Sequence, residues 1–282
     1  MPGILYVFGD LCVDIVAVPR SIPAPGEEVT LDRLDVVCGG AAFNCAVAAA
    51  RAGALVKVLA LVGEDEFGAM LLRRLRESGV DTSLTRAMPG RTGTVLSIAS
   101  PDGDRTLYSY RGVNAEQYSR LPEPQTGDHI YISGYSLQEA SSRQPARELK
   151  RQAQLSGAVC LLDPSFQSAA GLAASGFLDG LDWFTPNARE AELMTGSTDP
   201  ALLRALGVAN VVVTLGAQGC LLGTAAGITT AIPAEPISVT HSTGAGDAFC
   251  GGLLAALLQG ADPVEAAQLA TRAATAAIAH NE

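Results

Sequence analysis

Short apolar runs alternate with amphipathic segments along most of the chain. The runs contain few polar residues, which is typical of strands covered on both faces of a sheet. They lie at 4–8, 56–63, 129–133, 159–163, 182–187 and 210–216. Segments with helical periodicity or rich in alanine lie at 42–52, 66–78, 140–156, 245–259 and 263–279. Repeated strand–helix units predict an α/β fold with a doubly wound, mostly parallel sheet.

Two segments interrupt this alternation and predict a small second sheet. Residues 27–37 alternate between polar and apolar, as an exposed strand pair does. Two β-like runs within 93–110 are joined by Pro101-Asp102-Gly103-Asp104, a strong hairpin signal. We therefore expect the segments 11–37 and 92–112 to form a small β lid over a site.

Composition narrows the classes of partner. Of the 282 residues, 48% are hydrophobic, which is enough for a core and excludes disorder as the main state. Acidic residues number 29 and basic residues 19, a net charge of −10. We therefore expect neither nucleic acid nor an anionic membrane as partner. An anionic substrate would need a local positive site built from backbone amides, a metal ion or a few arginines.

Cysteine use and the first residues of the chain indicate a cytoplasmic location. The six cysteines are widely spaced, with no CxxC pair, and are expected to be small buried residues. The start, MPGILYVFGD, lacks the basic and long apolar regions of a signal peptide. No uninterrupted apolar run reaches the roughly 18 residues of a membrane span.

The segment HSTGAGDAF at 241–249 combines features of an anion site and of a catalytic base. Glycines before a helix let backbone N–H groups approach an anion, and the helix N-terminus adds partial positive charge. Asp247, in the first turn, would stand beside a bound phosphate and accept a proton from an attacking hydroxyl. The alternative is that Asp247 serves only the helix dipole and the glycines form an ordinary turn.

A second glycine pair precedes a helix near the start of the chain. Gly39 and Gly40 come before an alanine-rich segment that carries Asn44 in its first turn. The amide of Asn44 can donate and accept hydrogen bonds, as recognition of a polyhydroxylated ligand requires. Capping and close helix packing are the alternative.

Five motifs along the chain resemble one protein family when taken together. They are GGAAFN at 39–44, VGEDEFG at 62–68, PNAREAE at 186–192, VTLGAQG at 213–219 and STGAGDAF at 242–249. Their order resembles that in the ribokinase-like carbohydrate kinases, the PfkB family. The resemblance extends over nearly the whole chain and implies a single ribokinase-like domain at 1–282, with the lid segments inserted in it.

The resemblance implies an ATP-dependent kinase that phosphorylates a primary hydroxyl of a sugar or sugar-like molecule. Asp247 is then the general base, which deprotonates the hydroxymethyl group as its oxygen attacks the γ-phosphate. The amides of four residues would form the anion hole around the transferring phosphoryl group. These are Thr243, Gly244, Ala245 and Gly246.

The nucleotide side of the site is also implied by the resemblance. Asn187 and Glu190 match the family's NxxE motif, which is associated with Mg²⁺ and phosphate, the metal being held through water. From the residues alone, a helix cap completed by Glu190 is the alternative. Thr214, Gly216 and Gly219 match positions at a strand end, where ATP lies close to the backbone.

On the sugar side, Asp14, Gly40 and Asn44 match the family's substrate-contacting positions. For Asp14 the alternative is a solvated loop aspartate. Arg111 on the lid segment could contact a phosphate or carboxylate of the substrate, or could be merely exposed. Tyr135, just past a strand end, could contact the sugar or serve only in packing.

Three departures from the family pattern modify the expectation. His241 stands where the family has an aspartate that helps hold an activating monovalent cation, so we expect K⁺ to change activity little. Ser165 and Phe166 replace common polar positions after Asp163. The chain also ends soon after its last predicted helix, so part of the usual adenine-side segment is expected to be missing.

Alternative functions remain open at this point. A nucleoside kinase shares the same chemistry, and a non-catalytic protein of the same fold would bind a sugar or nucleotide without turnover. A dinucleotide oxidoreductase is disfavoured because the first strand leads into GDLCVD rather than GxGxxG. The exposed strand edges of the lid also allow a homodimer.

Overall fold

An eight-stranded sheet forms the centre of the computed structural model, which describes residues 3–99, 105–237 and 243–279. The spatial order is β14-β13-β12-β11-β10-β9-β1-β4. The strands are β1 (Ile4–Phe8), β4 (Leu55–Leu59), β9 (His129–Ser133), β10 (Val159–Asp163), β11 (Leu181–Phe184), β12 (Val208–Thr214), β13 (Cys220–Gly223) and β14 (Thr229–Ile232). Neighbours from β4 to β12 are parallel, whereas β13 and β14 pair antiparallel. The predicted mostly parallel sheet is thus confirmed.

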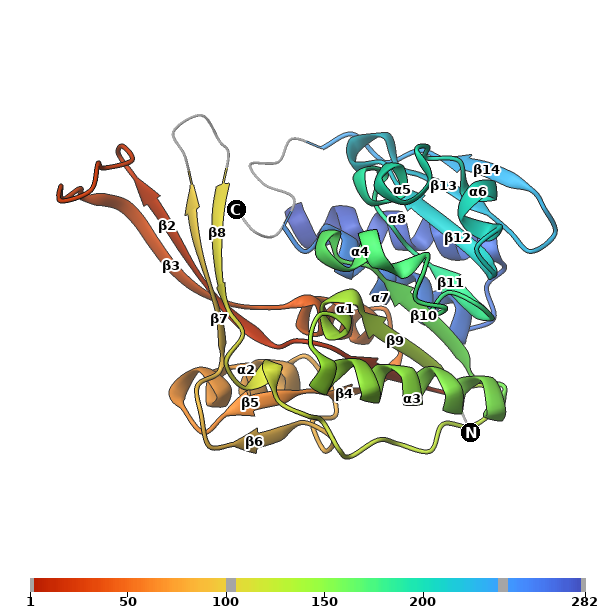
Figure 1. Ribbon diagram of the computed structural model, residues 1–282, viewed down its shortest axis with the longest axis horizontal. Coiled ribbons are helices and arrows are strands. Elements are labelled where there is room, and N and C mark those ends of the chain that lie inside the picture. Colours follow the sequence, from red (N-terminus) through yellow and green to blue (C-terminus); the bar gives the residue numbers. More distant parts are fainter. Residues whose placement is uncertain (1–2, 100–104, 238–242, 280–282) are drawn as a thin grey trace.

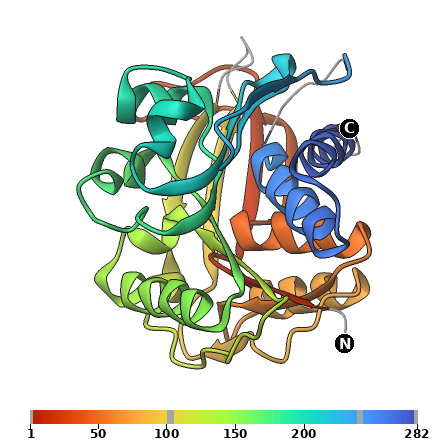
Figure 2. The same cartoon turned by 90° about the vertical axis from the view of Figure 1, so that its right-hand side faces the viewer.

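Helices cover both faces of this sheet (Figure 1 and Figure 2). One face carries α1 (Ala41–Arg51), α2 (Glu66–Glu77), α7 (Ala245–Leu258) and α8 (Pro263–Ala279). The other carries α3 (Ala140–Ser156), α4 (Phe166–Leu172), α5 (Ala188–Thr195) and α6 (Pro200–Arg204). Along β1, Leu5 and Val7 enter the first core, and Tyr6 and Phe8 enter the second. Burial on both faces explains why this strand has no polar alternation.

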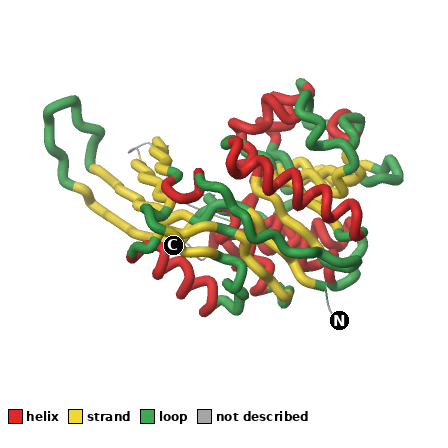
Figure 3. Tube along the Cα trace, turned by 60° about the horizontal axis from the view of Figure 1, so that its bottom comes forward, coloured by secondary structure: helices red, strands yellow, loops and turns green. Residues whose placement is uncertain are grey.

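A separate four-stranded sheet projects from the body of the molecule (Figure 1 and Figure 3). Its order is β3-β2-β7-β8. The strands are β2 (Cys12–Pro19), β3 (Leu31–Gly39), β7 (Gly93–Ala99) and β8 (Arg105–Tyr110). β7 and β8 pair antiparallel, as the hairpin prediction requires, although the predicted turn lies outside the described residues. That this sheet acts as a lid, and that its edges join two copies, stay predictions.

Two predictions about local structure were wrong. The expected strand pair at 27–37 is one strand, β3, whose partner β2 precedes it, and residues 27–30 form no strand. The apolar run at 56–63 splits into β4 and β5 (Leu61–Gly63), because pairing with β1 ends at Leu59. β5 then pairs with β6 (Arg86–Met88) in a two-stranded sheet of its own.

The polypeptide also contains three short 3₁₀ helices, η1 (Gly112–Ala115), η2 (Gly134–Leu137) and η3 (Gly216–Gln218), within the described ranges. In this part of the chain no helix has the length and apolar character needed to cross a bilayer. The six cysteines are free thiols, five of them buried and Cys38 half-buried. This agrees with their predicted role as small apolar residues.

Helices α1 and α7 approach each other closely because Gly251 has no side chain. A Cβ at Gly251 would overlap the carbonyl oxygen of Cys45 and lie 3.0 Å from the Ala49 nitrogen, both in the backbone of α1. Backbone atoms of a packed helix cannot move independently, so a larger residue would force the two helices apart. This contact sets the position of the N-terminus of α7 relative to α1.

We predict that Gly251→Ala lowers the free energy of unfolding by about 1–3 kcal/mol, although alanine favours helix formation. Gly171 in α4 is the matched control, because a Cβ there would meet no atom within 4 Å. Gly171→Ala should leave stability unchanged or raise it by about 0.5–1 kcal/mol. Urea unfolding of both variants provides the test, and equal effects would contradict the close packing described for Gly251.

Candidate active site

The N-terminus of α7 has backbone amides that no described side chain caps. Gly244 is the N-cap residue, with φ of 82°, a left-handed conformation that glycine adopts without strain. Gly244, Gly246 and Asp247 line an open cavity of about 160 Å³. The first-turn N–H groups of a helix have no intrahelical acceptor, so they are suited to an anion.

Asp247 is held in place by a side chain from α1. Asn44 Nδ2 donates a hydrogen bond to Asp247 Oδ2 at 2.9 Å, across 203 residues of sequence. Burial raises the pKa of Asp247 to about 6, and the nearby charge of Asp14 acts in the same direction. The hydrogen bond from Asn44 opposes this shift, because it stabilises the ionised carboxylate.

The cavity lies where several parallel strands end, as expected for a ligand site in an open α/β sheet. Its lining is mostly polar and comes from segments far apart in the sequence. The lining residues are Ser133, Tyr135, Asp163, Pro164, Ser165, Thr185, Asn187, Glu190, Thr214, Gly244, Gly246 and Asp247. Six of the predicted site residues are therefore gathered around one cavity: Asn187, Glu190, Thr214, Gly244, Gly246 and Asp247.

Asn187 and Glu190 form a reciprocal helix cap at the start of α5. The Glu190 backbone N–H donates to Asn187 Oδ1, and the Asn187 N–H donates to Glu190 Oε2, each at 2.9 Å. The capping alternative considered for this pair is thus correct as a description of its geometry. Both residues also line the cavity, so capping does not remove them from the site. Burial raises the pKa of Glu190 to about 7.

Asp163 is a cavity residue that sequence reasoning left out of the site. It ends β10, and its Oδ2 accepts a hydrogen bond from the Tyr131 hydroxyl at 3.0 Å. Burial and the charges of Asp247 and Glu190 raise its pKa well above the usual range. Its position as a polar residue ending a predicted parallel strand was the available signal.

The predicted sugar-contacting residues lie where α1 begins. Gly40 has φ of 95°, and a Cβ there would lie 2.5 Å from the carbonyl oxygen of Asp10. A Cβ at Gly39 would lie 2.6 Å from Asp14 Oδ2, so this glycine lets the carboxylate approach the backbone. Asp14, on β2, is near enough to raise the pKa of Asp247. The structure thus brings Asn44 into contact with Asp247 and Asp14 close to it, although neither these two residues nor Gly40 is among the lining residues of the cavity.

Other predicted residues lie away from the cavity lining. Gly216 and Gly219 are not among the lining residues, and a Cβ at Gly219 would overlap the backbone of Ile232 in the adjacent strand. Gly219 is therefore required by close strand packing. Thr243 and Ala245 flank the lining residue Gly244 without lining the cavity themselves. His241 lies outside the described residues.

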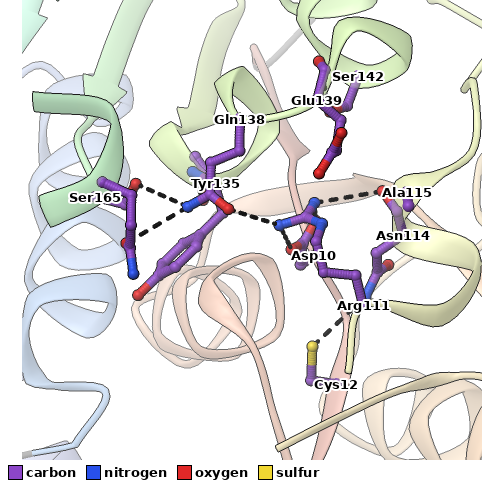
Figure 4. A network of polar contacts seen from close by, with 12 residues as sticks. Asp10, Cys12, Arg111, Asn114, Ala115, Tyr135, Gln138, Glu139, Ser142 and Ser165 are labelled. Carbon is purple, nitrogen blue, oxygen red and sulfur yellow. Dashed lines mark hydrogen bonds and ion pairs between the residues drawn. The ribbon is translucent and has the colours of Figure 1, made fainter. Parts of the chain in front are cut away.

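Arg111, considered as a contact for a substrate anion, pairs instead with an acid of this chain (Figure 4). Its Nη1 lies 3.0 Å from Asp10 Oδ2, and its Nη2 donates to Asp10 Oδ1 at 3.1 Å. Nη1 also donates to Gln138 Oε1 at 3.4 Å. Burial raises the pKa of Asp10 to about 6 despite this partner. The ion pair connects Arg111, just after β8 of the small sheet, with Asp10, just after β1 of the central sheet.

Comparison with sequence families gives one match, and it covers both the strands of the central sheet and the residues around the cavity. The model described as "pfkB family carbohydrate kinase" matches residues 5–282. A ribokinase of Bacillus subtilis is 27% identical, covering 97% of this chain and 92% of the relative. An aminoimidazole riboside kinase of Salmonella typhimurium is 28% identical over 89% of this chain and 79% of the relative.

Solved structures share the fold over almost the whole chain. Ribokinase of Arabidopsis thaliana, complexed with ribose and ATP, superposes with a TM-score of 0.84 at 21% identity, covering 100% of this chain and 94% of that one. Aminoimidazole riboside kinase from Salmonella enterica has a TM-score of 0.78 at 25% identity, covering 98% and 93% of the two chains. The doubly wound fold with its extra sheet is therefore a shared architecture.

We predict that Asp247→Asn stabilises the folded chain at neutral and basic pH. The folded-state pKa of about 6 lies above the ordinary 3.8, so ionised Asp247 is costly when buried. Above about pH 6 this cost reaches about 3 kcal/mol, and it disappears below about pH 4, where both states are protonated. Unfolding by urea between about pH 4 and pH 8 measures the difference.

The control is Glu192→Gln, which removes an exposed carboxylate from α5. Its stability relative to the natural chain should vary little with pH. A variant Asp247→Asn that is no more stable than the natural chain at about pH 8 would contradict the burial cost assigned to this carboxylate.

Proposed function

Because the chain belongs to the pfkB family of carbohydrate kinases, we propose that it transfers the γ-phosphate of ATP to a primary hydroxyl of a sugar or sugar-like molecule, with Asp247 as general base. The observation that carries this proposal is the hydrogen bond from Asn44 to Asp247, beside uncapped amides at the start of α7. A carboxylate held beside uncapped amides supports the proposal, because phosphoryl transfer to an alcohol requires a proton acceptor next to an anion site.

The pKa values support Asp247 over the other two carboxyl groups of the cavity. Burial and the charges of Asp247 and Glu190 raise the pKa of Asp163 well above its usual range, which disfavours its ionised form. Glu190, with a pKa of about 7, already accepts a backbone N–H through one oxygen. Asp247, with a pKa of about 6, is ionised at neutral pH and still basic enough to accept a proton from an alcohol in the transition state.

Backbone amides at the start of α7 are proposed to stabilise the transferring phosphoryl group. Gly244 and Gly246 line the cavity beside Asp247, and the helix N-terminus adds partial positive charge. The net charge of −10 makes the electrostatic potential around the chain repel a phosphate. The backbone N–H groups at the start of α7 supply a local attraction for it. Fixed dipoles that need no reorganisation are effective in stabilising such a transition state.

Mg²⁺ is proposed to enter with the nucleotide rather than to occupy a protein cage. Within the described ranges no cluster of three or more His, Cys, Asp or Glu side chains is placed to hold a metal. Mg²⁺ commonly binds through one or two carboxylates, phosphate oxygens and water, and Glu190 on the cavity wall fits this pattern. When bound, the ion neutralises charge on the phosphates.

The substrate is proposed to lie between Asp247 and the small sheet. Asp14 on β2 can accept hydrogen bonds from sugar hydroxyls. Gly39 leaves room for the Asp14 carboxylate, and Gly40 leaves room for the backbone of Asp10. Asn44 lies next to this position and donates from its Nδ2 to Asp247. Paired carboxylate and amide groups suit a polyhydroxylated ligand.

A nucleoside substrate is the second candidate, and one residue favours it. The Tyr135 side chain is 43% exposed and lines the cavity, so its ring is available to stack on a base. The relatives include an aminoimidazole riboside kinase as well as ribokinases. A thermal-shift panel of sugars and nucleosides, with ATP and Mg²⁺, separates these classes because the preferred ligand stabilises the folded state most.

We predict that Asp247→Asn binds ATP and the preferred substrate but loses about 10²–10⁴-fold in kcat. In the natural enzyme, kcat should rise with pH through about 6, where Asp247 ionises. Asn44→Ala should move this midpoint to higher pH, because the hydrogen bond that lowers the pKa of Asp247 is removed. Steady-state kinetics and ligand-induced thermal shifts measure both effects.

Glu192→Gln again serves as the control for loss of one negative charge, and it should keep the natural pH profile. Near-natural turnover by Asp247→Asn would refute the assignment of the base. Substrate and ATP binding without phosphorylation by the natural chain would instead favour a non-catalytic protein of the same fold.

A further inference from the structure

A second cavity lies outside the candidate active site, between the start of α3 and the helix α4. It has a volume of about 480 Å³ and shares no lining residue with the first cavity. Its walls come from η2, from α3 and from the segment that begins with α4. A volume of this size falls within the usual range for sites that bind small organic ligands.

The charge of this cavity is opposite to that of the whole chain. Arg143 and Arg147 line it, and the described lining residues include no aspartate or glutamate. The two arginines are four residues apart on α3, so their side chains lie on the same face of the helix. In a chain with 29 acidic and 19 basic residues, this is a local site for an anion.

Hydrogen bonds to backbone carbonyls hold both guanidinium groups in position. Arg143 Nε donates to the carbonyl of Leu137 at 2.9 Å, and its Nη2 donates to that of Gln138 at 3.0 Å. Arg147 Nη2 donates to the carbonyl of Ser175, across the cavity, at 3.3 Å. A guanidinium has five N–H donors, so each arginine keeps donors for a ligand. Both residues are exposed and therefore accessible.

The remaining walls combine polar groups with an apolar base. Gln167 and Ser168 line the cavity together with Leu172 and Phe177, which are buried. Arginines recognise phosphate through paired N–H groups, and the amide of Gln167 can recognise sugar hydroxyls, whereas the Ser168 hydroxyl is used in the cap of α4. We propose that this cavity binds a small phosphomonoester of a hydroxylated molecule, with its phosphate on Arg143 and Arg147.

One side chain connects this cavity with the candidate active site (Figure 4). Gln138 lines the second cavity, and its Nε2 donates to Ser165 Oγ at 3.3 Å and to Gln167 Oε1 at 3.5 Å. Ser165 lines the first cavity, and Gln138 Oε1 accepts from Arg111. A ligand in the second cavity would therefore lie beside the side chain that joins the active site to the Arg111–Asp10 pair.

Gly171 offers a test that leaves both arginines in place. It lines the cavity, and a Cβ at this position would meet no atom within 4 Å. Gly171→Asp adds a negative charge to the anion site, and Gly171→Asn is the neutral control of the same shape. Calorimetric titration uses ribose 5-phosphate, fructose 6-phosphate and glucose 6-phosphate as probes, with inorganic phosphate for comparison. A non-hydrolysable ATP analogue is kept saturating, so that phosphate binding at α7 is blocked.

We expect at least one ester to bind the nucleotide-saturated chain at one molecule per chain. Gly171→Asp should weaken this binding about tenfold or more by charge repulsion, and Gly171→Asn should change it less than about twofold. Absence of saturable binding by all three esters would overturn the proposal. So would equal effects of the two variants on ester binding, or inorganic phosphate binding as tightly as the esters. Because turnover is not measured, failure here leaves the proposed kinase activity untouched.

Discussion

The close contact between α1 and α7 fixes the relation between the candidate base and the side chain that holds it. Gly251 allows the two backbones to meet, and Asn44 then reaches Asp247 across 203 residues of sequence. The same contact presents the uncapped amides of α7 to the cavity. If the helices were further apart, the Asp247 carboxylate would lose its hydrogen-bond donor, Asn44. The candidate catalytic geometry is therefore a consequence of helix packing.

The sheet explains why so many acidic groups lie together in a chain that must bind a phosphate. Asp163 comes from the end of β10, Glu190 from the helix after β11, and Asp247 from the helix after the β13–β14 hairpin. Parallel strands end at one edge, so these carboxyl groups converge on it. Burial raises the pKa of all three groups, to about 6 for Asp247, to about 7 for Glu190 and well above the usual range for Asp163. These raised pKa values limit the negative charge that the three carboxyl groups place in the cavity.

Much of this arrangement could be predicted from sequence, because strands buried on both faces have a simple pattern. The runs at 4–8, 129–133 and 159–163 are the strands observed, and Asp247 and Asn44 lie in the first turns expected. The split at Ala60 could not be predicted, since both halves of that run are apolar and only tertiary pairing distinguishes them. The partner of Arg111 was equally inaccessible, because Asp10 lies 101 residues away.

Asp247 and the amides of α7 are proposed to act on the acceptor hydroxyl and the terminal phosphate of one reaction, and a crystal structure tests this directly. Crystals grown with the preferred sugar or nucleoside and a non-hydrolysable ATP analogue should place the terminal phosphate on the amides of Gly244 to Asp247. The acceptor hydroxyl should then lie about 2.6–3.2 Å from an Asp247 carboxylate oxygen. A terminal phosphate bound elsewhere, or a hydroxyl turned away from Asp247, would contradict the account.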